Sequence, residues 1–274
     1  MLTTGLIGTN KEIESFFSSL TKEQKRAVAG LHIIGDTYDE CSAKLQKPSF
    51  QTLEHFPDET EVLLVLSGSE QSFQLAISGL KLGKDIVMAK YSDLDLEKIE
   101  RLEKLSKEAE RTFFLLPNTD FLQPPLDPET PHTYYIHRER YVSDIKEASL
   151  FPVLYTDLLQ LYKLSKQGVD RIKVLSSPKL MNTNSPITLL INFANGMHCS
   201  LVYSQASKRN LFILYQGQEV RTIEHPLNKP DETQYNRKDA KVVAKLISDT
   251  STPSGLQDAS IIKQAMLCVK EMIK

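Results

Sequence analysis

Short apolar runs alternate with helix-like segments along the first 116 residues of the chain. The runs, which the pattern predicts to be strands, span residues 2–7, 28–34, 62–66, 86–89 and 113–116. The run at residues 62–66 has no polar–apolar alternation, which is typical of a strand that helices cover on both faces of a parallel sheet. Helices are predicted at residues 11–20, 38–45, 71–82 and 94–110. This order predicts a layered α/β domain with a parallel sheet.

The stretch from residue 62 to residue 91 is one predicted strand–helix–strand unit. Gly83 is the expected end of its helix, because glycine adopts the left-handed conformation that commonly follows a last helical turn. Ligands of parallel sheets bind beyond the carboxyl ends of the strands. We therefore expect the loops at residues 67–71 and 90–92 to face one crevice, with any chemistry between them.

A sharp turn at Gly8-Thr9-Asn10 joins the first predicted strand to the first helix. A dinucleotide-binding domain of the Rossmann type has its phosphate-binding turn at this place, with backbone amides at the helix start. Gly8 fills the first position of the Gly-x-Gly-x-x-Gly pattern, whereas Asn10 holds the second and Ile13 the third. Asparagine can keep the backbone conformation, but its side chain intrudes on the pyrophosphate, and Ile13 is expected to push the helix outward. A phosphate-binding turn and a turn without this role both remain open.

Asp36 lies at the end of the second predicted strand. A carboxylate at this place in a Rossmann domain binds the adenosine ribose hydroxyls and disfavours the extra phosphate of NADP. The same side chain can cap the predicted helix at residues 38–45. Both roles are open, and the first implies NAD as the cofactor.

Five prolines between residues 117 and 131 indicate a linker, which places a domain boundary near residue 120. Beyond it, strands and hairpins are predicted at residues 134–142, 172–175, 187–193, 197–203, 211–215 and 219–223. Helices are predicted at residues 151–164, 237–248 and 256–273. We expect a Rossmann-type domain at residues 1–120 and an α+β domain with a mostly antiparallel open sheet at residues 121–274. A packing of the C-terminal helices, residues 237–273, against the first domain stays open.

Composition narrows the functional classes. Hydrophobic residues make up 41% and charged residues 25%, which are ordinary globular values, and the net charge of -2 argues against a nucleic-acid partner. The three cysteines lack metal-type spacing and are expected to be reduced core thiols, and the six histidines show no spacing of a metal site. No stretch approaches the length of a membrane span, and the amino terminus lacks a signal-like pattern. We expect a cytoplasmic protein with no metal and no membrane partner.

The chain resembles the Gfo/Idh/MocA family, the glucose–fructose oxidoreductase and inositol dehydrogenase relatives. The similarity is best at residues 65–91, onto which the family's Thr-Pro-Asn-x-x-His loop, Ala-Gly-Lys helix end and Glu-Lys-Pro loop can be laid without a gap. Residues 235–273 resemble the family's closing segment, including Pro253-Ser254-Gly255-Leu256. The resemblance implies a Rossmann domain followed by a mostly antiparallel sheet domain, with hydride transfer between NAD(P) and a small sugar-like substrate. It also implies a homodimer formed through the open face of the second-domain sheet.

Several site residues are implied by this resemblance. Lys90 falls on the family's Glu-Lys-Pro lysine, which lies near the nicotinamide and the reacting hydroxyl of the substrate. Serines stand where the family's loop has Thr, Asn and His, and Asn118 matches an asparagine that often follows the last Rossmann strand. The implied cofactor-binding residues are Gly8, Thr9, Asn10, Asp36, Ser67, Ser69, Ser72, Lys90 and Asn118.

The second half departs from the family's Asp-x-Gly-x-His-x-x-Asp pattern. With Asp157 as the anchor, leucines take the histidine position (Leu154) and the first aspartate position. General acid–base groups typically contribute about 10²- to 10⁴-fold in rate, so this loss requires a substitute. Lys90, Tyr91 and Tyr155 are the candidate catalytic groups, because a desolvated lysine or a tyrosine beside a cation can transfer a proton. The alternative is that Lys90 is solvated and the tyrosines only pack.

Two functional hypotheses follow. The first is an NAD(P)-dependent oxidoreductase that acts on a sugar, polyol or related small carbonyl compound, with NAD favoured over NADP. The second is a non-catalytic Rossmann-fold scaffold or metabolite-sensing pseudoenzyme, which the incomplete glycine pattern and the missing acid–base pair favour. Cofactor binding separates the two, because ordered nicotinamide beside Lys90 would contradict the scaffold.

Overall fold

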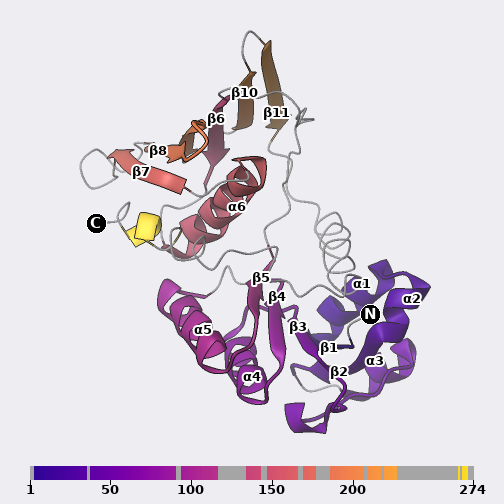
Figure 1. Ribbon diagram of the computed structural model, residues 1–274. Helices are drawn as coiled ribbons and strands as arrows, with labels where there is room; N and C mark the ends of the chain where they lie inside the picture. The colour runs from indigo at the N-terminus through magenta and orange to yellow at the C-terminus, as the bar shows by residue number, and fades with distance from the viewer. Residues whose placement is uncertain are drawn as a thin grey trace. The chain divides into compact units, whose positions relative to one another are not determined.

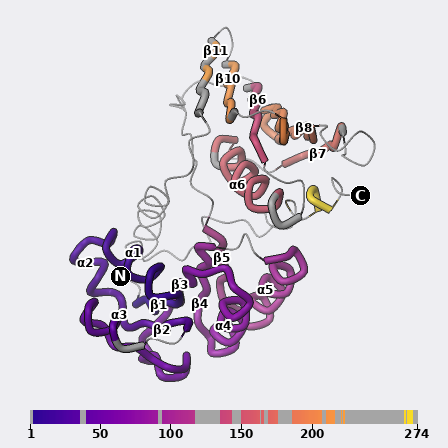
Figure 2. The backbone as a smooth tube through the Cα atoms, turned by 180° about the vertical axis from the view of Figure 1, so that it is seen from behind, coloured from indigo at the N-terminus to yellow at the C-terminus, as the bar shows by residue number. Residues whose placement is uncertain are grey.

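The computed structural model describes residues 3–35, 38–90, 94–116, 134–142, 147–165, 169–176, 186–206, 209–216, 219–226, 265 and 267–270. These residues belong to two units, with residues 3–116 in the first and residues 134–226 and 265–270 in the second. Figures 1 and 2 show the elements of each unit from opposite sides. The predicted boundary near residue 120 falls outside the described residues and stays a prediction. The packing against the first domain of residues 237–273, most of which also lie outside the described residues, stays a prediction as well.

The first unit is built on a five-stranded parallel sheet (Figure 1). Its strands are β1 (Thr4–Gly8), β2 (Val28–Ile33), β3 (Val62–Val65), β4 (Asp85–Met88) and β5 (Phe113–Leu115). Its helices are α1 (Asn10–Ser19), α2 (Lys22–Ala27), α3 (Tyr38–Leu45), α4 (Glu70–Lys81) and α5 (Leu96–Glu108), with a 3-10 turn η1 (Leu53–His55). The predicted α/β domain with a parallel sheet is confirmed.

The strand order β2-β1-β3-β4-β5 decides where a ligand can bind. Ser49 forms an isolated parallel bridge to Leu31, at the free edge of β2, where a doubly wound sheet would continue with a further strand. The order of the strands reverses between β1 and β3. Ligand crevices of open α/β sheets lie at such a reversal, outside the carboxyl ends of the strands. This topology therefore assigns the crevice to the ends of β1 and β3, near Gly8 and Leu66.

Packing on both faces explains why the strands of the first unit lack alternation. On one face, Leu64 of β3 joins a core cluster that includes Ile13 of α1. On the other face, Leu63 lies against α4, where a Cβ on Gly79 would come within 2.8 Å of Leu63 Cδ1 and 2.6 Å of Ile86 Cδ1. Neighbouring residues of β3 are thus both buried, which leaves no solvent-facing position in this strand.

The second unit combines a six-stranded sheet with one long helix, α6 (Glu147–Ser165). Its strands are β6 (Tyr134–Tyr141), β7 (Val169–Ser176), β8 (Ile187–Phe193), β9 (His198–Ser204), β10 (Arg209–Gln216) and β11 (Glu219–Pro226). The strand order is β11-β10-β6-β9-β8-β7, and every pair is antiparallel except β6 with β9. The expected α+β unit with a mostly antiparallel sheet is confirmed, whereas the hairpin pattern did not predict the parallel pair.

The second sheet has one buried face and one open face. In β8, Leu189 and Ile191 are fully buried, whereas Leu190 between them is 37% exposed, so burial alternates along this strand. The register places Tyr135 of β6 and Tyr215 of β10 on the same side as Leu190. Their rings lie 5.5 Å apart, centroid to centroid, so the open face carries an aromatic pair.

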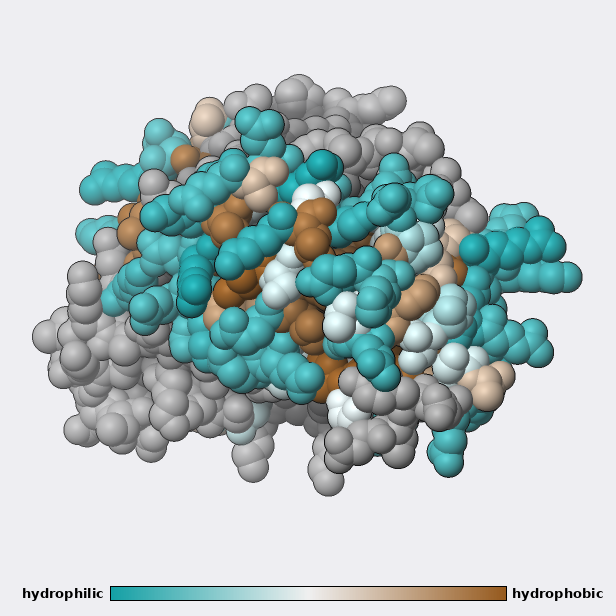
Figure 3. All heavy atoms as spheres, turned by 90° about the horizontal axis from the view of Figure 1, so that it is seen from below, coloured by the Kyte–Doolittle hydropathy of each residue, from teal (hydrophilic) through white to brown (hydrophobic). Residues whose placement is uncertain are grey.

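The surface and the cysteines agree with an ordinary globular protein. Figure 3 shows one face, on which hydrophilic side chains predominate and hydrophobic ones form small groups between them. No helix in the described part of the chain has both the length and the hydrophobicity to span a bilayer. Cys41, Cys199 and Cys268 are buried free thiols, as predicted.

Candidate functional site

The candidate site lies at the carboxyl ends of β1, β3 and β4 in the first unit. Gly8 ends β1, Ser67 lies just beyond the end of β3, and Lys90 just beyond the end of β4. A Cβ on Gly8 would lie 3.1 Å from Leu66 Cβ and 3.4 Å from a carboxylate oxygen of Glu12. Glycine therefore lets the turn after β1 pack closely against the end of β3. Gly8 keeps the place predicted for it in this turn, and its cofactor role stays a prediction.

Thr9 and Glu12 form a capping box at the start of α1. The Thr9 hydroxyl accepts a hydrogen bond from the Glu12 backbone N–H at 3.4 Å, and Thr9 N–H donates to Glu12 Oε2 at 3.1 Å. The Thr9 hydroxyl also donates to Glu12 Oε2 at 2.9 Å. The amide that the Rossmann pattern offers to a phosphate is thus held by a carboxylate of the chain itself.

Lys90, which follows β4, also contacts the Glu12 side chain. Its Nζ lies 2.8 Å from Glu12 Oε1, so the second carboxylate oxygen of Glu12 is also bonded. The Lys90 side chain is 43% exposed and that of Glu12 is 20% exposed. The end of β4 and the start of α1 therefore come together at the carboxyl edge of the sheet, and Lys90 is ion-paired there instead of fully solvated. The crevice expected between residues 67–71 and 90–92 stays a prediction.

The turn fits a dinucleotide pyrophosphate only when the Glu12 carboxylate turns away from it. The glycine at position 8 gives the close approach that phosphates need, and the start of α1 supplies a donor and the positive end of a helix dipole. The Glu12 side chain is partly exposed and joined to the turn by rotatable bonds, so it can leave without a change of the backbone. Asn10 is the first residue of α1, and its side-chain oxygen is shielded from solvent.

The predicted serines serve the start of α4. Ser69 caps this helix, and its Oγ accepts a hydrogen bond from Ser72 N–H at 3.2 Å. The two hydroxyls are 2.9 Å apart, and Ser72 is fully buried. Ser67 is also largely buried, at 8% exposure. These contacts explain the serines as cap and packing residues, and their binding to a cofactor stays a prediction.

Three predicted site residues lie outside the described residues. These are Asp36, Tyr91 and Asn118. Their assigned roles, ribose recognition for Asp36, proton transfer for Tyr91 and cofactor contact for Asn118, stay predictions.

In the second unit, the anchor of the family's acid–base pattern is a structural ion pair. Asp157 of α6 is fully buried and accepts hydrogen bonds from Arg140 Nε at 3.0 Å and Arg140 Nη2 at 2.7 Å. Arg138 Nε lies 3.0 Å from the same carboxylate, and the Tyr203 hydroxyl donates to it at 3.0 Å. Burial lowers the pKa of Arg138 to about 10, although Asp157 partly offsets this effect. The cluster ties α6 to β6 and β9.

The other positions of that pattern are apolar and buried. Leu150 and Leu154, which stand where the family has an aspartate and a histidine, are fully buried. Tyr155 is also fully buried, and its ring stacks on Phe151 with a centroid distance of 5.9 Å. Burial raises the pKa of the Tyr155 hydroxyl strongly, so it stays protonated at neutral pH. This environment favours the packing alternative for Tyr155, and its catalytic role stays a prediction.

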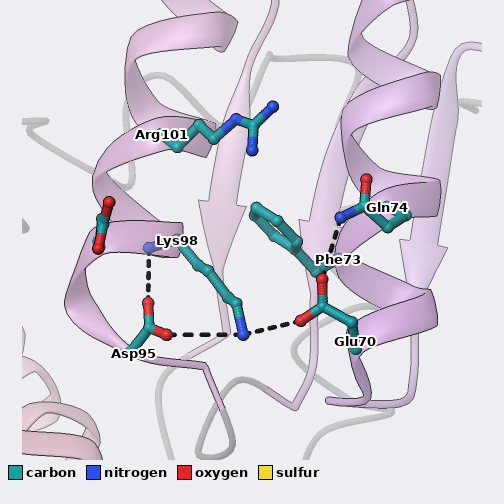
Figure 4. A pocket seen from close by; sticks show the side chains of 7 residues that line it. Glu70, Phe73, Gln74, Asp95, Lys98 and Arg101 are labelled. Atoms are coloured by element: carbon teal, nitrogen blue, oxygen red, sulfur yellow. Dashed lines mark hydrogen bonds and ion pairs between the residues drawn. The ribbon is translucent and has the colours of Figure 1, made fainter.

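A surface hollow of about 250 Å³ lies between α4 and α5 (Figure 4). Lys98 bridges its two sides, with Nζ 2.7 Å from Glu70 and 3.5 Å from Asp95. Lys98 and Arg101 lie over the Phe73 ring, within 5.8 and 5.9 Å of its centroid. These groups neutralise one another, so the hollow is explained as helix–helix packing. No His, Cys, Asp and Glu cluster suited to a metal occurs among the residues that the structure describes.

Sequence reasoning missed Glu12. The signal was present as Thr9-x-x-Glu12, the pattern of a capping box at the start of a helix. Its contact with Lys90, 78 positions away, could not be read from any local pattern.

No protein-family model matches the sequence, and no curated protein matches it. Solved structures match the fold. One is a probable dehydrogenase from Thermotoga maritima, with a TM-score of 0.67 and 13% identity, covering 98% of this chain and 96% of that chain. Another is GenD2 from gentamicin A biosynthesis in complex with NAD, with a TM-score of 0.62 and 11% identity, covering 98% and 93%. UDP-N-acetylglucosamine 3-dehydrogenase GnnA from Acidithiobacillus ferrooxidans matches with a TM-score of 0.59 and 14% identity, covering 98% and 95%.

These matches extend over both units of the chain. At identities of 11 to 14% they show a shared fold. The chain therefore shares the fold of these structures, and the architecture that the resemblance implied, a parallel-sheet unit followed by a mostly antiparallel one, is confirmed.

Proposed function

We propose that the chain is an NAD(P)-dependent oxidoreductase of the Gfo/Idh/MocA type, acting on a sugar, polyol or related small carbonyl compound. The observation that carries this proposal is the position of Lys90. Its ammonium group lies at the carboxyl end of β4 and contacts the Glu12 carboxylate beside the turn after β1. This is the crevice in which doubly wound sheets bind ligands. The fold shared with a UDP-N-acetylglucosamine 3-dehydrogenase supports a sugar-like substrate.

The chemistry assigns a proton-handling role to Lys90. A bound nicotinamide would supply the hydride acceptor for the oxidation of a secondary alcohol to a carbonyl. The hydroxyl proton of that alcohol must pass to a group of the protein as the C=O bond forms. Lys90, in its neutral form, is our candidate acceptor, with Tyr91 and Tyr155 as the other sequence-based candidates. In the reverse direction, the Lys90 ammonium donates the proton to the carbonyl oxygen.

Cofactor choice and assembly belong to the same proposal. We favour NAD over NADP because Asp36 follows the second strand, and GenD2 is a fold neighbour in complex with NAD. We also propose a homodimer through the open face of the second sheet, where Tyr135 and Tyr215 are 41% and 37% exposed. A cytoplasmic location is part of the proposal as well.

Cofactor titration tests the proposal first. The chain has no tryptophan, so the emission of NADH itself, together with calorimetry, reports binding without interference from indole. Saturable binding is expected, and no binding at millimolar NADH or NADPH would remove the proposal. Turnover on a panel of sugars and polyols then tests Lys90. We expect Lys90→Met to lower kcat by about a hundredfold or more, as for loss of an acid–base group. Lys84→Met is the matched control, because Lys84 precedes β4 at the opposite end of the strand.

The non-catalytic alternative has its own support. Leu150 and Leu154 are buried where the family has acid–base residues, and Glu12 holds the phosphate-binding amide. A scaffold or metabolite sensor predicts that NADH binds weakly or not at all and that no substrate of the panel is turned over. Turnover that depends on Lys90 would exclude it.

A further inference from the structure

The Glu12 carboxylate occupies the hydrogen-bonding groups that an incoming phosphate would use. One oxygen accepts from Thr9 N–H and from the Thr9 hydroxyl, and the other lies 2.8 Å from Lys90 Nζ. The amino-terminal end of a helix favours negative charge, and α1 begins directly after Thr9. A side chain of the protein thus already provides the anion that this turn attracts.

We propose that Glu12 is a built-in competitor for the cofactor's pyrophosphate. Binding of a dinucleotide then requires the Glu12 side chain to swing out of the turn, which also releases Lys90 into the crevice. This inference rests on the proposed function and deepens it, because it assigns the control of cofactor affinity to one residue of the same site.

The contacts of Glu12 make such a displacement feasible. Both partners of the ion pair are partly exposed, at 20% for Glu12 and 43% for Lys90, so water can take over the bonds that are broken. Glu12 lies in the first turn of α1 and Lys90 just beyond β4, so their side chains can move while α1 and β4 stay in place. The released Lys90 ammonium can then pair with a phosphate or contact the substrate oxygen.

The competition is electrostatic as well as steric. Two like charges about 5 Å apart near a protein surface repel strongly enough to change a dissociation constant by about tenfold or more. The Glu12–Lys90 pair adds to this effect, because it cancels the nearest cation that would otherwise attract the pyrophosphate. Removing the charge of Glu12 therefore raises the affinity for the dinucleotide in two ways. It ends the repulsion of the pyrophosphate, and it leaves the Lys90 ammonium group free to attract it.

Glu12→Gln is the variant that separates charge from structure. The chain shows that glutamine serves in this kind of cap, since Thr21 N–H donates to Gln24 Oε1 at 2.8 Å at the start of α2. Glu14→Gln is the matched control. It changes the net charge equally on the same helix, but Glu14 pairs with Lys44 away from the turn.

Calorimetric titration with NADH, NADPH and ADP-ribose measures the effect without relying on turnover. We expect Glu12→Gln to bind at least one of these probes about tenfold more tightly than the wild type, which corresponds to about 1.4 kcal/mol. Glu14→Gln is expected to bind like the wild type. The advantage of Glu12→Gln should shrink in about 1 M salt, because salt screens exposed charges.

The outcomes separate this inference from the proposed function. Wild-type binding with no gain in Glu12→Gln, or an equal gain in Glu14→Gln, overturns the inference and leaves the proposed function standing. Wild-type binding that Glu12→Gln strengthens and Glu14→Gln does not strengthen supports the inference. Binding by Glu12→Gln alone also supports competition by Glu12, but it removes the proposed function of the wild-type chain. Absence of binding in all three proteins at millimolar probe, with each protein folded by circular dichroism, overturns both.

Discussion

Replacing Asp157 by asparagine should strongly destabilise the second unit. The Asp157 carboxylate is fully buried between Arg138 and Arg140, whose side chains are only 5% and 9% exposed. Asparagine keeps the volume but removes the only negative charge of this cluster of two guanidinium groups and one carboxylate. Removing one partner of a buried ion pair typically costs about 3–5 kcal/mol, because the remaining charge stays buried and uncompensated. We expect a loss in this range for Asp157→Asn.

Amide hydrogen exchange followed by mass spectrometry is the suitable assay, because the two units need not unfold together. Peptides from α6 and β9 should exchange roughly a hundredfold to several thousandfold faster in Asp157→Asn, which corresponds to that free-energy range. Peptides from β1 to β5 should change little. Glu14→Gln gives the surface comparison, since solvent screens its pair with the exposed Lys44 and the pair contributes little to stability.

A variant that lacks all three charged side chains tests whether the loss of stability comes from uncompensated buried charge. Replacing Asp157, Arg138 and Arg140 together by Leu, Met and Met removes the charges along with the need to pair them. Such replacements by apolar residues are often neutral or stabilising. The triple variant should therefore be more stable than Asp157→Asn. A cost below about 1 kcal/mol for Asp157→Asn, or a triple variant less stable than the single one, would refute the reasoning.

Two further predictions concern the first helix and the core tyrosine. Glu12→Ala should lower the free energy of unfolding of the first unit by about 0.5–2 kcal/mol through loss of the capping box, whereas Glu12→Gln should lower it less. Urea unfolding followed by circular dichroism measures both losses. Equal losses in the two variants would contradict a stabilising role of the capping box. Burial raises the pKa of Tyr155 above its usual 10.0, so its contribution to stability is full below pH 10 and declines as pH rises above that value. The free energy of unfolding of Tyr155→Phe should therefore improve relative to wild type between about pH 10 and 11, and an unchanged difference would argue against this burial.

Local patterns were sufficient for most elements of the fold. The apolar runs without alternation predicted the parallel sheet, because helices cover β3 on both faces and leave no solvent-facing position. The hairpin predicted at residues 187–193 and 197–203 is formed by β8 and β9, and its turn needs the left-handed conformation that Gly196 adopts. Short α2 was missed, because its six residues carry little hydrophobic period and only Ala27 is buried.

The candidate site was predicted only in part. The sequence indicated Gly8, Thr9 and Lys90 from the turn and the strand ends, and the topology assigns them to one edge of the sheet. It did not indicate that Glu12 joins Thr9 to Lys90. A capping box is a local pattern, but the choice of Lys90 as its partner depends on β1 and β4 lying in one sheet with β3 between them.

The sequence by itself determined most of the strands and helices and which of their faces are apolar, because these depend on neighbours within a few residues. The tertiary structure decided which charges meet. Asp157 could be aligned with a catalytic aspartate, yet in the fold it is enclosed by Arg138, Arg140 and Tyr203. Those contacts arise because β6 pairs in parallel with β9, a long-range pairing that no local pattern encodes, and burial then makes each charge depend on its partners.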